Sequence, residues 1–476
     1  MAATAVERKL FVDGEWVETG DWQEVRSPFS GDVVARVAKA GGTLARKAVD
    51  AAARAIAEGL ATHRRAEILE RTARLLEERH EEVAQTICAE AGKPMKAARL
   101  EAQRAVSTFE TSAAVARRLA GEVVPMDASA AGAGKLAFTV REPIGVVGAI
   151  SPFNFPLNLV AHKVAPALAA GCAVVLKPAA QTPLSALLLA ELEHDAGLPQ
   201  GWLNVLVGRA SEIGNVLVED ERVRMITFTG SGDVGWGLRE RAARKKVTLE
   251  LGNSTPVLVE PDADLEDTAA KLATHAFSFA GQSCISVQRI YVRRAAYNDF
   301  VARFVPKVEA LRVGDPADEA TDVGPVIDED ARDRIRSWIE EAKENGATEL
   351  TGGDEQGLIR PTVLADVTPE MKVSCEEVFG PVCVVAAYDT LDEGVRLANS
   401  TRYGLQAGIF TGSVESALSA ARRLEFGGVV VNEAPTFRAD QMPYGGVKAS
   451  GNTKEGPPYT VREMTEERLI VLAGGG

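Results

Sequence analysis

One thiol stands at the centre of a stretch of small residues, SFAGQSCISVQ, at positions 278–288. Cys284 is either a buried, inert cysteine, as most free cysteines are, or a nucleophile. A thiol hydrolase needs a positioned imidazole base. His162 and His275 are the candidates for that base, but neither lies in a recognisable dyad motif, and His275 falls within an apolar helix, where a packed core residue is expected. The stretch alone leaves both interpretations open.

A carboxylate and an amide lie in surroundings where polar side chains are costly. Glu250 ends the apolar strand VTLEL, and a carboxylate there must be paired, solvated or protonated. It is either a general base with a raised pKa or a salt-bridged strand end. Asn154 lies between two prolines in SPFNFP. Its amide is either a donor to an oxyanion or the centre of an Asx-type turn.

Two further features fit a bound dinucleotide. FTGSGDVG, at 228–235, follows a predicted strand and precedes a helix expected to begin at Gly235. Gly230 and Gly235 allow a tight turn, and free N–H groups at a helix start favour a phosphate. The spacing is not GxGxxG, so an ordinary strand–helix turn is the alternative. Lys177 ends the strand AVVLK, where α/β sheets place ligand contacts, and it either binds ribose or phosphate or is a solvated strand end.

Strands and helices alternate from about position 145, which predicts the frame that holds these residues. The strand-like segments GVVGAI, AVVLKP, WLNVLVG, MITFTG and KVTLEL alternate with helical segments, and this order implies a parallel sheet with helices on both faces. A second run of this kind begins near Thr255, so we expect two doubly wound α/β units joined near Leu251. Before them, a hairpin is expected over 10–17 and helices over 43–60, 65–91 (stopped by Gly92 and Pro94) and 95–119.

Composition argues against several classes of partner. The 476 residues are 46% hydrophobic and 25% charged, with a net charge of −14, and this acidic balance argues against nucleic acid or an anionic membrane as the main partner, since both need a basic patch. The apolar passage over 143–178 contains five prolines and two lysines, so a membrane span is not expected. Five cysteines without a CxxC pair, and an N-terminus without an apolar signal region, favour free thiols and a cytoplasmic protein.

Seven motifs occur in order along the chain: SPFNFPLNL, LKPAAQTP, FTGSGDVG, LELGNSTP, GQSC, EEVFGPV and MPYGGVKASG. With these motifs and their spacing, the chain resembles the aldehyde dehydrogenase superfamily from about Phe11 to its C-terminus. The separation of 34 positions between Glu250 and Cys284 is similar to that of the non-acylating members. The resemblance implies an α/β fold of aldehyde dehydrogenase type, with two doubly wound α/β domains and a small β oligomerisation part.

The resemblance also implies a reaction, the oxidation of an aldehyde to a carboxylic acid with NAD(P). Cys284 is then the nucleophile that forms a thiohemiacetal, whose oxyanion is held by the Asn154 amide and the Cys284 backbone N–H. Loss of a hydride to the nicotinamide leaves a thioester, and Glu250 activates the water that hydrolyses it. Backbone donors, the charge of the cofactor and Glu250, acting through Lys163, would tune the thiol. No metal is implied.

The resemblance implies that the backbone of Ile150 and Ser151 lies along the cofactor and that Lys177 binds its ribose. Gly230, Ser231 and Gly235 match the diphosphate turn. Glu377 matches the nicotinamide-ribose ligand, with Phe379 packed beside it. One position departs from many NAD-preferring members, which carry Glu three residues after the lysine. Here that residue is Ala180, which does not repel a 2′-phosphate. The resemblance and this departure together predict NADP as the cofactor, with NAD as the alternative.

The aldehyde is expected in a tunnel whose implied lining residues are Phe109, Phe155, His162, Ile285, Arg438 and Tyr444. Arg438 stands where several members carry an aromatic residue. It either binds a distal anionic or polar group of the aldehyde or forms an ion pair within its own loop. Ser283 stands where some members that take phosphorylated or acidic aldehydes carry Arg, which weakens the anionic interpretation.

The family fold divides the chain into three expected parts. Residues 1–123 and 142–251 form a cofactor-binding domain, and residues 252–448 form a catalytic domain. Residues 124–141 and 449–476 form oligomerisation segments. An exposed strand pair needs a partner to cover its edge, so a homodimer or homotetramer is expected.

Three other interpretations compete with this one. A CoA-acylating aldehyde dehydrogenase is disfavoured by Glu250, since those members generally lack the general base. A catalytically silent binding or structural protein on the same fold is disfavoured because Asn154, Glu250 and Cys284 are all present. A cysteine hydrolase would act without a nicotinamide cofactor.

Overall fold

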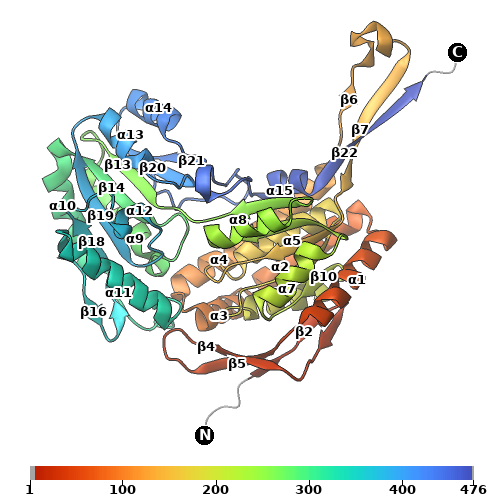
Figure 1. Ribbon diagram of the computed structural model, residues 1–476, viewed down its shortest axis with the longest axis horizontal. Helices are drawn as coiled ribbons and strands as arrows, with labels where there is room; N and C mark the ends of the chain where they lie inside the picture. Colours follow the sequence, from red (N-terminus) through yellow and green to blue (C-terminus); the bar gives the residue numbers. More distant parts are fainter. Residues whose placement is uncertain (1–5, 474–476) are drawn as a thin grey trace.

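The computed structural model describes residues 6–473. Two seven-stranded sheets with flanking helices form the body, and a three-stranded sheet projects from it (Figure 1). The predicted alternation of strands and helices, and the two largely parallel sheets that follow from it, are confirmed. Within residues 6–473, no helix is both long enough and apolar enough to cross a membrane.

The first large sheet has the strand order β12-β11-β8-β9-β10-β2-β3. The strands from β12 to β10 run parallel, and the predicted hairpin β2–β3 adds an antiparallel edge. Nearly all residues of β8 and β9 are buried, as expected for strands covered on both faces. The strands are β2 (Leu10–Val12), β3 (Glu15–Val17), β8 (Val146–Ile150), β9 (Ala173–Lys177), β10 (Leu203–Val205), β11 (Val223–Thr229) and β12 (Lys246–Glu250).

The helices of this half share one buried core with the sheet. The helix expected over 65–91 is two helices separated at Arg79, whose φ is −103° and whose guanidinium pairs with Glu82 and Glu191. No glycine or proline marks this break. The helices are α1 (Gly42–Glu58), α2 (Thr62–Glu78), α3 (His80–Ala91), α4 (Met95–Arg118), α5 (Asn158–Ala170), α6 (Leu184–Asp195), α7 (Ala210–Glu219) and α8 (Gly232–Arg241).

The second large sheet has the strand order β15-β18-β19-β14-β13-β20-β21, parallel except for β15 at one edge. Its strands are β13 (Thr255–Val259), β14 (Val287–Arg293), β15 (Thr348–Thr351), β18 (Thr362–Ala365), β19 (Val382–Tyr388), β20 (Gln406–Phe410) and β21 (Gly428–Val431). Its helices are α9 (Leu265–Phe277), α10 (Arg294–Glu309), α11 (Glu329–Glu344), α13 (Leu391–Asn399) and α14 (Val414–Arg423). No helix was expected from the sequence at α11, α13 or α14.

The projecting sheet has the order β22-β7-β6, with β6 (Val123–Val124), β7 (Lys135–Pro143) and β22 (Thr465–Ala473). It extends away from the body in Figure 1, and its exposed apolar side chains include Leu136, Leu469 and Leu472. The expected oligomerisation segment 449–476 is only partly in this sheet. The helix α15 (Pro457–Glu463) packs instead on α4 and α5 of the body.

Smaller elements complete the described chain. A three-stranded sheet near the N-terminus has the order β1-β5-β4, and β16 pairs with β17. Their bounds are β1 (Val6–Arg8), β4 (Trp22–Arg26), β5 (Val33–Ala38), β16 (Asp354–Glu355) and β17 (Leu358–Ile359). The short helical turns are α12 (Lys372–Cys375), η1 (Met126–Ala128), η2 (Ala130–Gly132), η3 (Ser278–Gly281) and η4 (Lys448–Ser450).

Candidate active site

Cys284 lies between α9 and β14, just after the short turn η3. Phe279 and Ala280, within η3, have φ values of 50° and 53°, and such left-handed strain gathers at functional sites. Gly281 also has a positive φ, and a Cβ there would collide with the carbonyl oxygen of Gly380. The loop is therefore held tightly against the EEVFGPV segment. Its half-buried thiol faces a cavity of about 140 Å³.

Among the described residues, the only hydrogen-bond partner of the Cys284 sulfur is the hydroxyl of Tyr444, 2.9 Å away. Burial raises the pKa of the thiol to about 12. The Tyr444 contact and the charge of Arg438 lower this pKa, while Glu377 and Glu250 raise it further. Burial therefore disfavours the reactive thiolate in the protein without a bound cofactor. A positive charge brought by a bound nicotinamide would favour the thiolate.

Glu250, at the end of β12, is 4% exposed, and neither of its carboxylate oxygens has a hydrogen-bond partner within residues 6–473. Burial, and then the charge of Glu455, raise its pKa well above the ordinary value, against the charges of Arg438, Lys163 and Lys454. The salt-bridged strand end considered in the sequence analysis is therefore not what the structure shows. An unpaired carboxyl with a raised pKa suits a general base.

A buried charge cluster lies beside Glu250. The carboxylate of Glu455 accepts from Lys163 at 3.2 Å and from Arg438 at 3.1 Å, and all three side chains are at most 5% exposed. Burial favours the neutral acid, but the charges of Lys163 and Arg438 hold the pKa of Glu455 at about 2. Lys163 also donates to Thr229 at 2.7 Å. Lys163 therefore forms hydrogen bonds with Glu455 and Thr229, and it acts on Glu250 only through the electrostatic effect of its charge.

Asn154 lies in the loop between β8 and α5, and its side-chain amide donates to the carbonyl oxygen of Gln282 at 3.0 Å. This contact crosses to the loop of Cys284, so the amide is not folded back into an Asx turn. The Asn154 Oδ1 is buried and has no partner in the described part of the chain. Lys93 holds the residue from the other side, because its ammonium donates to the Asn154 backbone carbonyl at 2.7 Å. The amide retains a second N–H for another acceptor.

Lys93 and Glu101 form a buried ion pair that the sequence analysis did not find. Glu101 also accepts two backbone N–H groups at the start of α5, at 3.0 and 3.1 Å. The ammonium of Lys93 lies 3.8 Å from the ring centre of Phe155 and 4.5 Å from that of Phe279. The pair therefore fixes both the Asn154 loop and two aromatic walls of the cavity. In the sequence, Lys93 lies between Gly92 and Pro94, which predict only the end of a helix.

Four of the predicted tunnel residues line the cavity beside Cys284: Phe155, Ile285, Arg438 and Tyr444. The other two predicted residues do not line this cavity, so the lining expected from the sequence is corrected. Phe109 is fully buried in the core of the first sheet, and His162, also fully buried, contacts Asp440 at 2.9 Å. His275, expected in the core, is half-buried and lines the cavity.

Two arginines line the same cavity. Arg104, on α4, donates to Asp440 at 2.8 Å. Arg438 donates to Glu455 and lies 3.9 Å from the ring centre of Tyr444, so the ion pair considered for it is present. The Nε atoms of both guanidinium groups are buried without a hydrogen-bond partner among residues 6–473. Each arginine thus has a donor that the described protein does not use.

Predicted cofactor contacts gather where β8 and β9 end. The strand order reverses between β8 and β11, and α/β sheets bind ligands at such a point. Ile150 pairs with Lys177 across the two strands, and Ser151 donates its N–H to the Lys177 carbonyl at 3.2 Å. In the described chain, Ser151 Oγ is buried without a partner, and the Lys177 ammonium donates only to the Pro178 carbonyl, at 3.2 Å. Burial lowers the pKa of Lys177, and Ala180 lies in the turn that follows.

The glycine turn leads into α8, which begins at Gly232, three residues earlier than predicted. Ser231 is the residue before the helix, and Gly235 lies in its first turn. A Cβ at Gly235 would lie 2.6 Å from the side chain of Leu251, so this glycine lets α8 lie close to the chain that leaves β12. Gly230 links β11 to this turn. The free N–H groups at the start of α8 are suited to a phosphate.

Glu377 accepts the backbone N–H of Asn253 at 3.0 Å, and burial raises its pKa to about 7. A Cβ at Gly252 would collide with its carboxylate, so the glycine makes room for this side chain. Phe379 has a φ of 50° and packs edge-on against Phe153, with 5.7 Å between ring centres. Glu377 and Phe379 thus lie in the same strained segment that supports the thiol loop.

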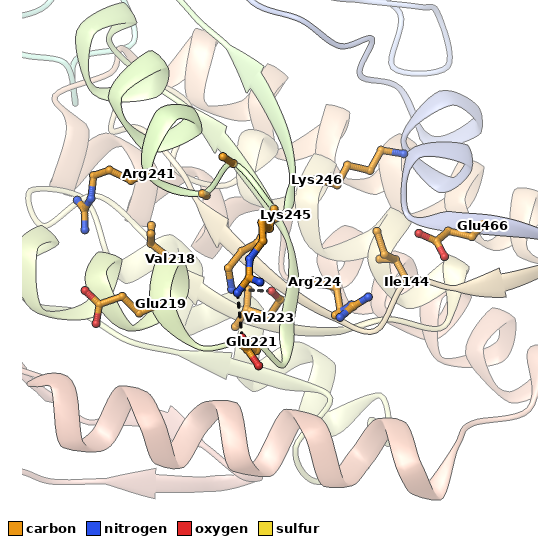
Figure 2. Close-up of a pocket in the computed structure, with 13 residues that line it drawn as sticks. Ile144, Val218, Glu219, Glu221, Val223, Arg224, Arg241, Lys245, Lys246 and Glu466 are labelled. Atoms are coloured by element: carbon orange, nitrogen blue, oxygen red, sulfur yellow. Dashed lines mark hydrogen bonds and ion pairs between the residues drawn. The ribbon is translucent and has the colours of Figure 1, made fainter.

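A wider hollow, of about 690 Å³, lies beside α7, α8 and β12 (Figure 2). Charged side chains such as Glu219, Arg224 and Arg241 line it. Others on its wall are already paired: Lys245 donates to the Val223 carbonyl at 2.8 Å, and Lys246 pairs with a carboxylate on α15 at 2.6 Å. None of the predicted site residues lies there. Size alone therefore does not identify the active site.

The fold and the arrangement around the thiol indicate a dehydrogenase of the α/β class. A model of the aldehyde dehydrogenase family matches residues 16–470. The chain belongs to this family and is an NAD(P)-dependent aldehyde dehydrogenase, which oxidises an aldehyde to a carboxylic acid, as predicted.

Similar proteins cover almost the whole chain. The 3-sulfolactaldehyde dehydrogenase of Priestia aryabhattai is 47% identical over 464 residues, which are 97% of each chain. Aldehyde dehydrogenase 21 of Physcomitrella patens, solved with the reaction product succinate, has a TM-score of 0.97 at 41% identity and 100% coverage of both chains. The glyceraldehyde-3-phosphate dehydrogenase GapN of Methanocaldococcus jannaschii, solved with NADP, has a TM-score of 0.92 at 38% identity, covering 96% of this chain and 100% of that one. These similarities confirm the predicted fold class.

Proposed function

We propose that this enzyme oxidises a short aldehyde with an anionic group at its far end, and that Arg104 and Arg438 bind that group. The observation that carries the proposal is the pair of guanidinium groups on the cavity of Cys284, each with a buried Nε that has no partner within residues 6–473. Guanidinium groups match carboxylate, sulfonate and phosphate oxygens in charge and geometry. The cavity of about 140 Å³ is smaller than the roughly 300–1,000 Å³ of sites for drug-sized ligands, which favours a short aldehyde.

The names of similar proteins support an anionic substrate. The Priestia aryabhattai relative is named for a sulfonated aldehyde, and the Physcomitrella patens structure holds succinate, a dicarboxylate. Ser283 does not provide the arginine that some members use for acidic aldehydes. Arg104, which the sequence analysis did not consider, provides a second guanidinium from another element.

The proposed chemistry starts at Cys284, whose thiolate attacks the aldehyde carbon to form a thiohemiacetal. The free N–H of the Asn154 amide and the backbone N–H of Cys284 hold the oxyanion, and such donors are worth about 3 kcal/mol each. A bound nicotinamide supplies the hydride acceptor. Glu250 then takes a proton from the water that hydrolyses the thioester to the carboxylic acid.

Lys163 acts in this proposal through Glu455. Its ammonium, with Arg438, keeps Glu455 ionised, and the charge of Glu455 raises the pKa of Glu250, while the charge of Lys163 itself lowers that pKa. A base whose pKa lies nearer to neutrality transfers protons more readily in both directions. Lys163 is therefore a positioning residue for the base and does not contact the substrate.

The proposed cofactor is NADP. Lys177 has unused donors and Ser151 has an unpaired hydroxyl among the described residues, so both fit a polar ligand at the strand ends. Ala180 presents no carboxylate against a 2′-phosphate. The start of α8, with Gly230, Ser231 and Gly235, would hold the diphosphate. Glu377 would hold the nicotinamide ribose, with Phe379 packed beside it and the Ile150–Ser151 backbone along the cofactor.

The proposal extends to the assembly and its compartment. The open edge of β22 and the exposed apolar side chains Val123, Leu136 and Leu469 support a homodimer or homotetramer formed through the projecting sheet. All five cysteines are free, which supports a reducing, cytoplasmic compartment. The division into a cofactor-binding and a catalytic domain near Leu251 fits the sheets, since this residue lies between β12 and β13.

The test measures reduced nicotinamide by absorbance, with aldehydes of equal length that do or do not carry a terminal carboxylate or sulfonate, each with NADP and with NAD. We expect a higher kcat/KM for the anionic member of each pair. Arg104→Gln should lower that value about tenfold or more, since a hydrogen bond to a charged group is lost, and should leave the neutral aldehyde unchanged. Equal losses for both aldehydes would contradict the anion site.

The same assay separates the competing functions. Cys284→Ala should give no signal with any aldehyde. A dependence on CoA would point to the acylating alternative. No signal from wild-type protein with intact NADP binding would point to a silent member of the fold.

A further inference from the structure

The sulfur of Cys284 and the hydroxyl of Tyr444 lie 2.9 Å apart, a contact that the reaction described above does not use. We propose that Tyr444 is a catalytic residue, whose hydroxyl donates a hydrogen bond to the Cys284 thiolate and stabilises it before the aldehyde binds. The proposal rests on the role of Cys284 as nucleophile. Tyr444 then acts on the nucleophile in addition to lining the cavity.

Tyr444 is fixed in place by its surroundings. Its backbone N–H donates to the carbonyl of Glu455 at 3.1 Å, and its own carbonyl accepts from the Glu455 N–H at 2.5 Å. Its ring packs with Ile285 and Leu405, and the Arg438 guanidinium covers one face of the ring. Only 3% of the residue is exposed. The contact with the sulfur is therefore part of the packed site.

The direction of the hydrogen bond follows from the acidity of its two partners. Burial, and then the charge of Cys284, raise the pKa of Tyr444 well above its ordinary value, although Arg438 opposes this. A phenol in this position keeps its proton and can only donate to an ionised sulfur. Charge-assisted hydrogen bonds of this kind are among the stronger ones.

The thiolate needs such a donor. Burial disfavours the charged sulfur, and the carboxylates of Glu377 and Glu250 also disfavour it, while Arg438 favours it. Within residues 6–473, no other side chain forms a hydrogen bond with this sulfur. Removing the Tyr444 hydroxyl would leave the thiolate without a side-chain donor.

The test follows alkylation of Cys284 by iodoacetamide in the full-length enzyme without substrate, from about pH 6 to about pH 9, by mass spectrometry of the Cys284 peptide. The reagent is neutral, so Arg104 and Arg438 do not attract it. Tyr444→Phe keeps the ring and its contact with Arg438 and removes only the hydroxyl. Tyr297→Phe, on α10, is the matched control.

We expect alkylation of Tyr444→Phe to be about three- to tenfold slower at each pH, and that of Tyr297→Phe to be unchanged. Loss of a hydrogen bond to a charged group lowers the thiolate fraction about tenfold or more. The remaining thiolate is a stronger nucleophile because its pKa is higher, which offsets part of the loss. Wild-type alkylation rates in Tyr444→Phe would overturn the proposal.

A second variant covers the case in which Tyr444→Phe does not fold. Fluorotyrosine at position 444 has a more acidic hydroxyl, so it is a stronger donor and should speed alkylation; an unchanged rate would overturn the proposal. Failure of the nucleophile itself is a different result. If Cys284→Ala still oxidises aldehydes, the assignment of Cys284 is wrong, whereas an essential Cys284 with unchanged alkylation in Tyr444→Phe removes only the role of Tyr444.

Discussion

Buried carboxylates differ in their hydrogen-bond partners between two regions of this enzyme. In the helical layer of the first sheet, Glu90 accepts the backbone N–H groups of Leu184 and Ser185 at 2.6 and 2.9 Å, and Glu101 accepts two N–H groups at the start of α5. Beside the thiol, Glu250 accepts from no group in the described chain. Glu90 and Glu101 thus complete helix ends, while the lone pairs of Glu250 remain open.

The contrast separates groups that support the fold from groups that await a ligand. A buried polar atom without a partner costs about 1–3 kcal/mol, so such atoms are rare and need a reason. Within residues 6–473, four of them, on Ser151, Asn154 and Glu250, lie in the predicted cofactor crevice or near the thiol loop. The larger hollow of Figure 2 is lined by charged side chains, several of which are already paired. Unpaired atoms are therefore a better guide to this site than volume.

The largest expected effect comes from Glu250→Gln. The variant should lose about 10²–10⁴-fold in kcat, because the general base is gone, and should melt no lower than wild type, because the carboxylate has no partner to lose. The base works only when ionised and its pKa is raised, so the wild-type rate should climb as pH rises through that pKa. This climb should vanish in the variant. Parallel profiles of kcat against pH would contradict the comparison.

Glu101→Gln should show the reverse pattern, with stability as the first loss. Breaking a buried ion pair leaves Lys93 as an uncompensated charge, at a cost of about 3–5 kcal/mol in the free energy of unfolding. Denaturant titration measures the loss. Glu81→Gln is the control, because its pair with Arg99 is exposed and contributes little to stability. An unchanged midpoint for Glu101→Gln would show that the helical layer does not depend on its carboxylates.

Ala180→Glu adds a carboxylate to the crevice and should reverse the cofactor preference. A negative charge close to a 2′-phosphate should shift the ratio of kcat/KM for NADP to that for NAD by about tenfold or more toward NAD. Steady-state kinetics with both cofactors measures the ratio. Gln181→Glu, at the exposed next position, should change it less. Equal shifts in both variants would place the 2′-phosphate elsewhere.

The smallest effect is expected at a buried carboxylate that departs from the contrast between the helical layer and the active site. Glu193 is buried in α6, in the helical layer, yet neither oxygen has a partner among the described residues. Burial raises its pKa from 4.5 to about 8, so the unfolded chain ionises first and stability is lost as pH rises between these values. Glu193→Gln should be more stable than wild type at pH 8 and should differ little from it near pH 4.5. Melting curves that respond alike to pH in both proteins would show that Glu193 is already satisfied.

Much of this arrangement was open to prediction from the sequence, and the parts that were not have physical reasons. The alternation of apolar strands with helical segments was enough to predict both large sheets. Lys93 was missed because its significance comes from Asn154, 61 positions away. The position of His162 was predicted wrongly because every residue of α5 is buried. The hydrophobic pattern therefore does not indicate which face of this helix points toward the cavity. The helix break at Arg79 has no glycine or proline to announce it.

If subunits associate through the projecting sheet, as proposed, the order of synthesis of its strands limits when they can meet. β22 pairs with β7 along nine residues, whereas β6 contributes two. β22 leaves the ribosome after every other described strand, so both large sheets emerge before it. Until then, β7 has only one short neighbour, and the surface for a partner is incomplete. Association through this sheet would then have to wait until synthesis is nearly complete, after the stage at which exposed strand edges most readily cause misassembly.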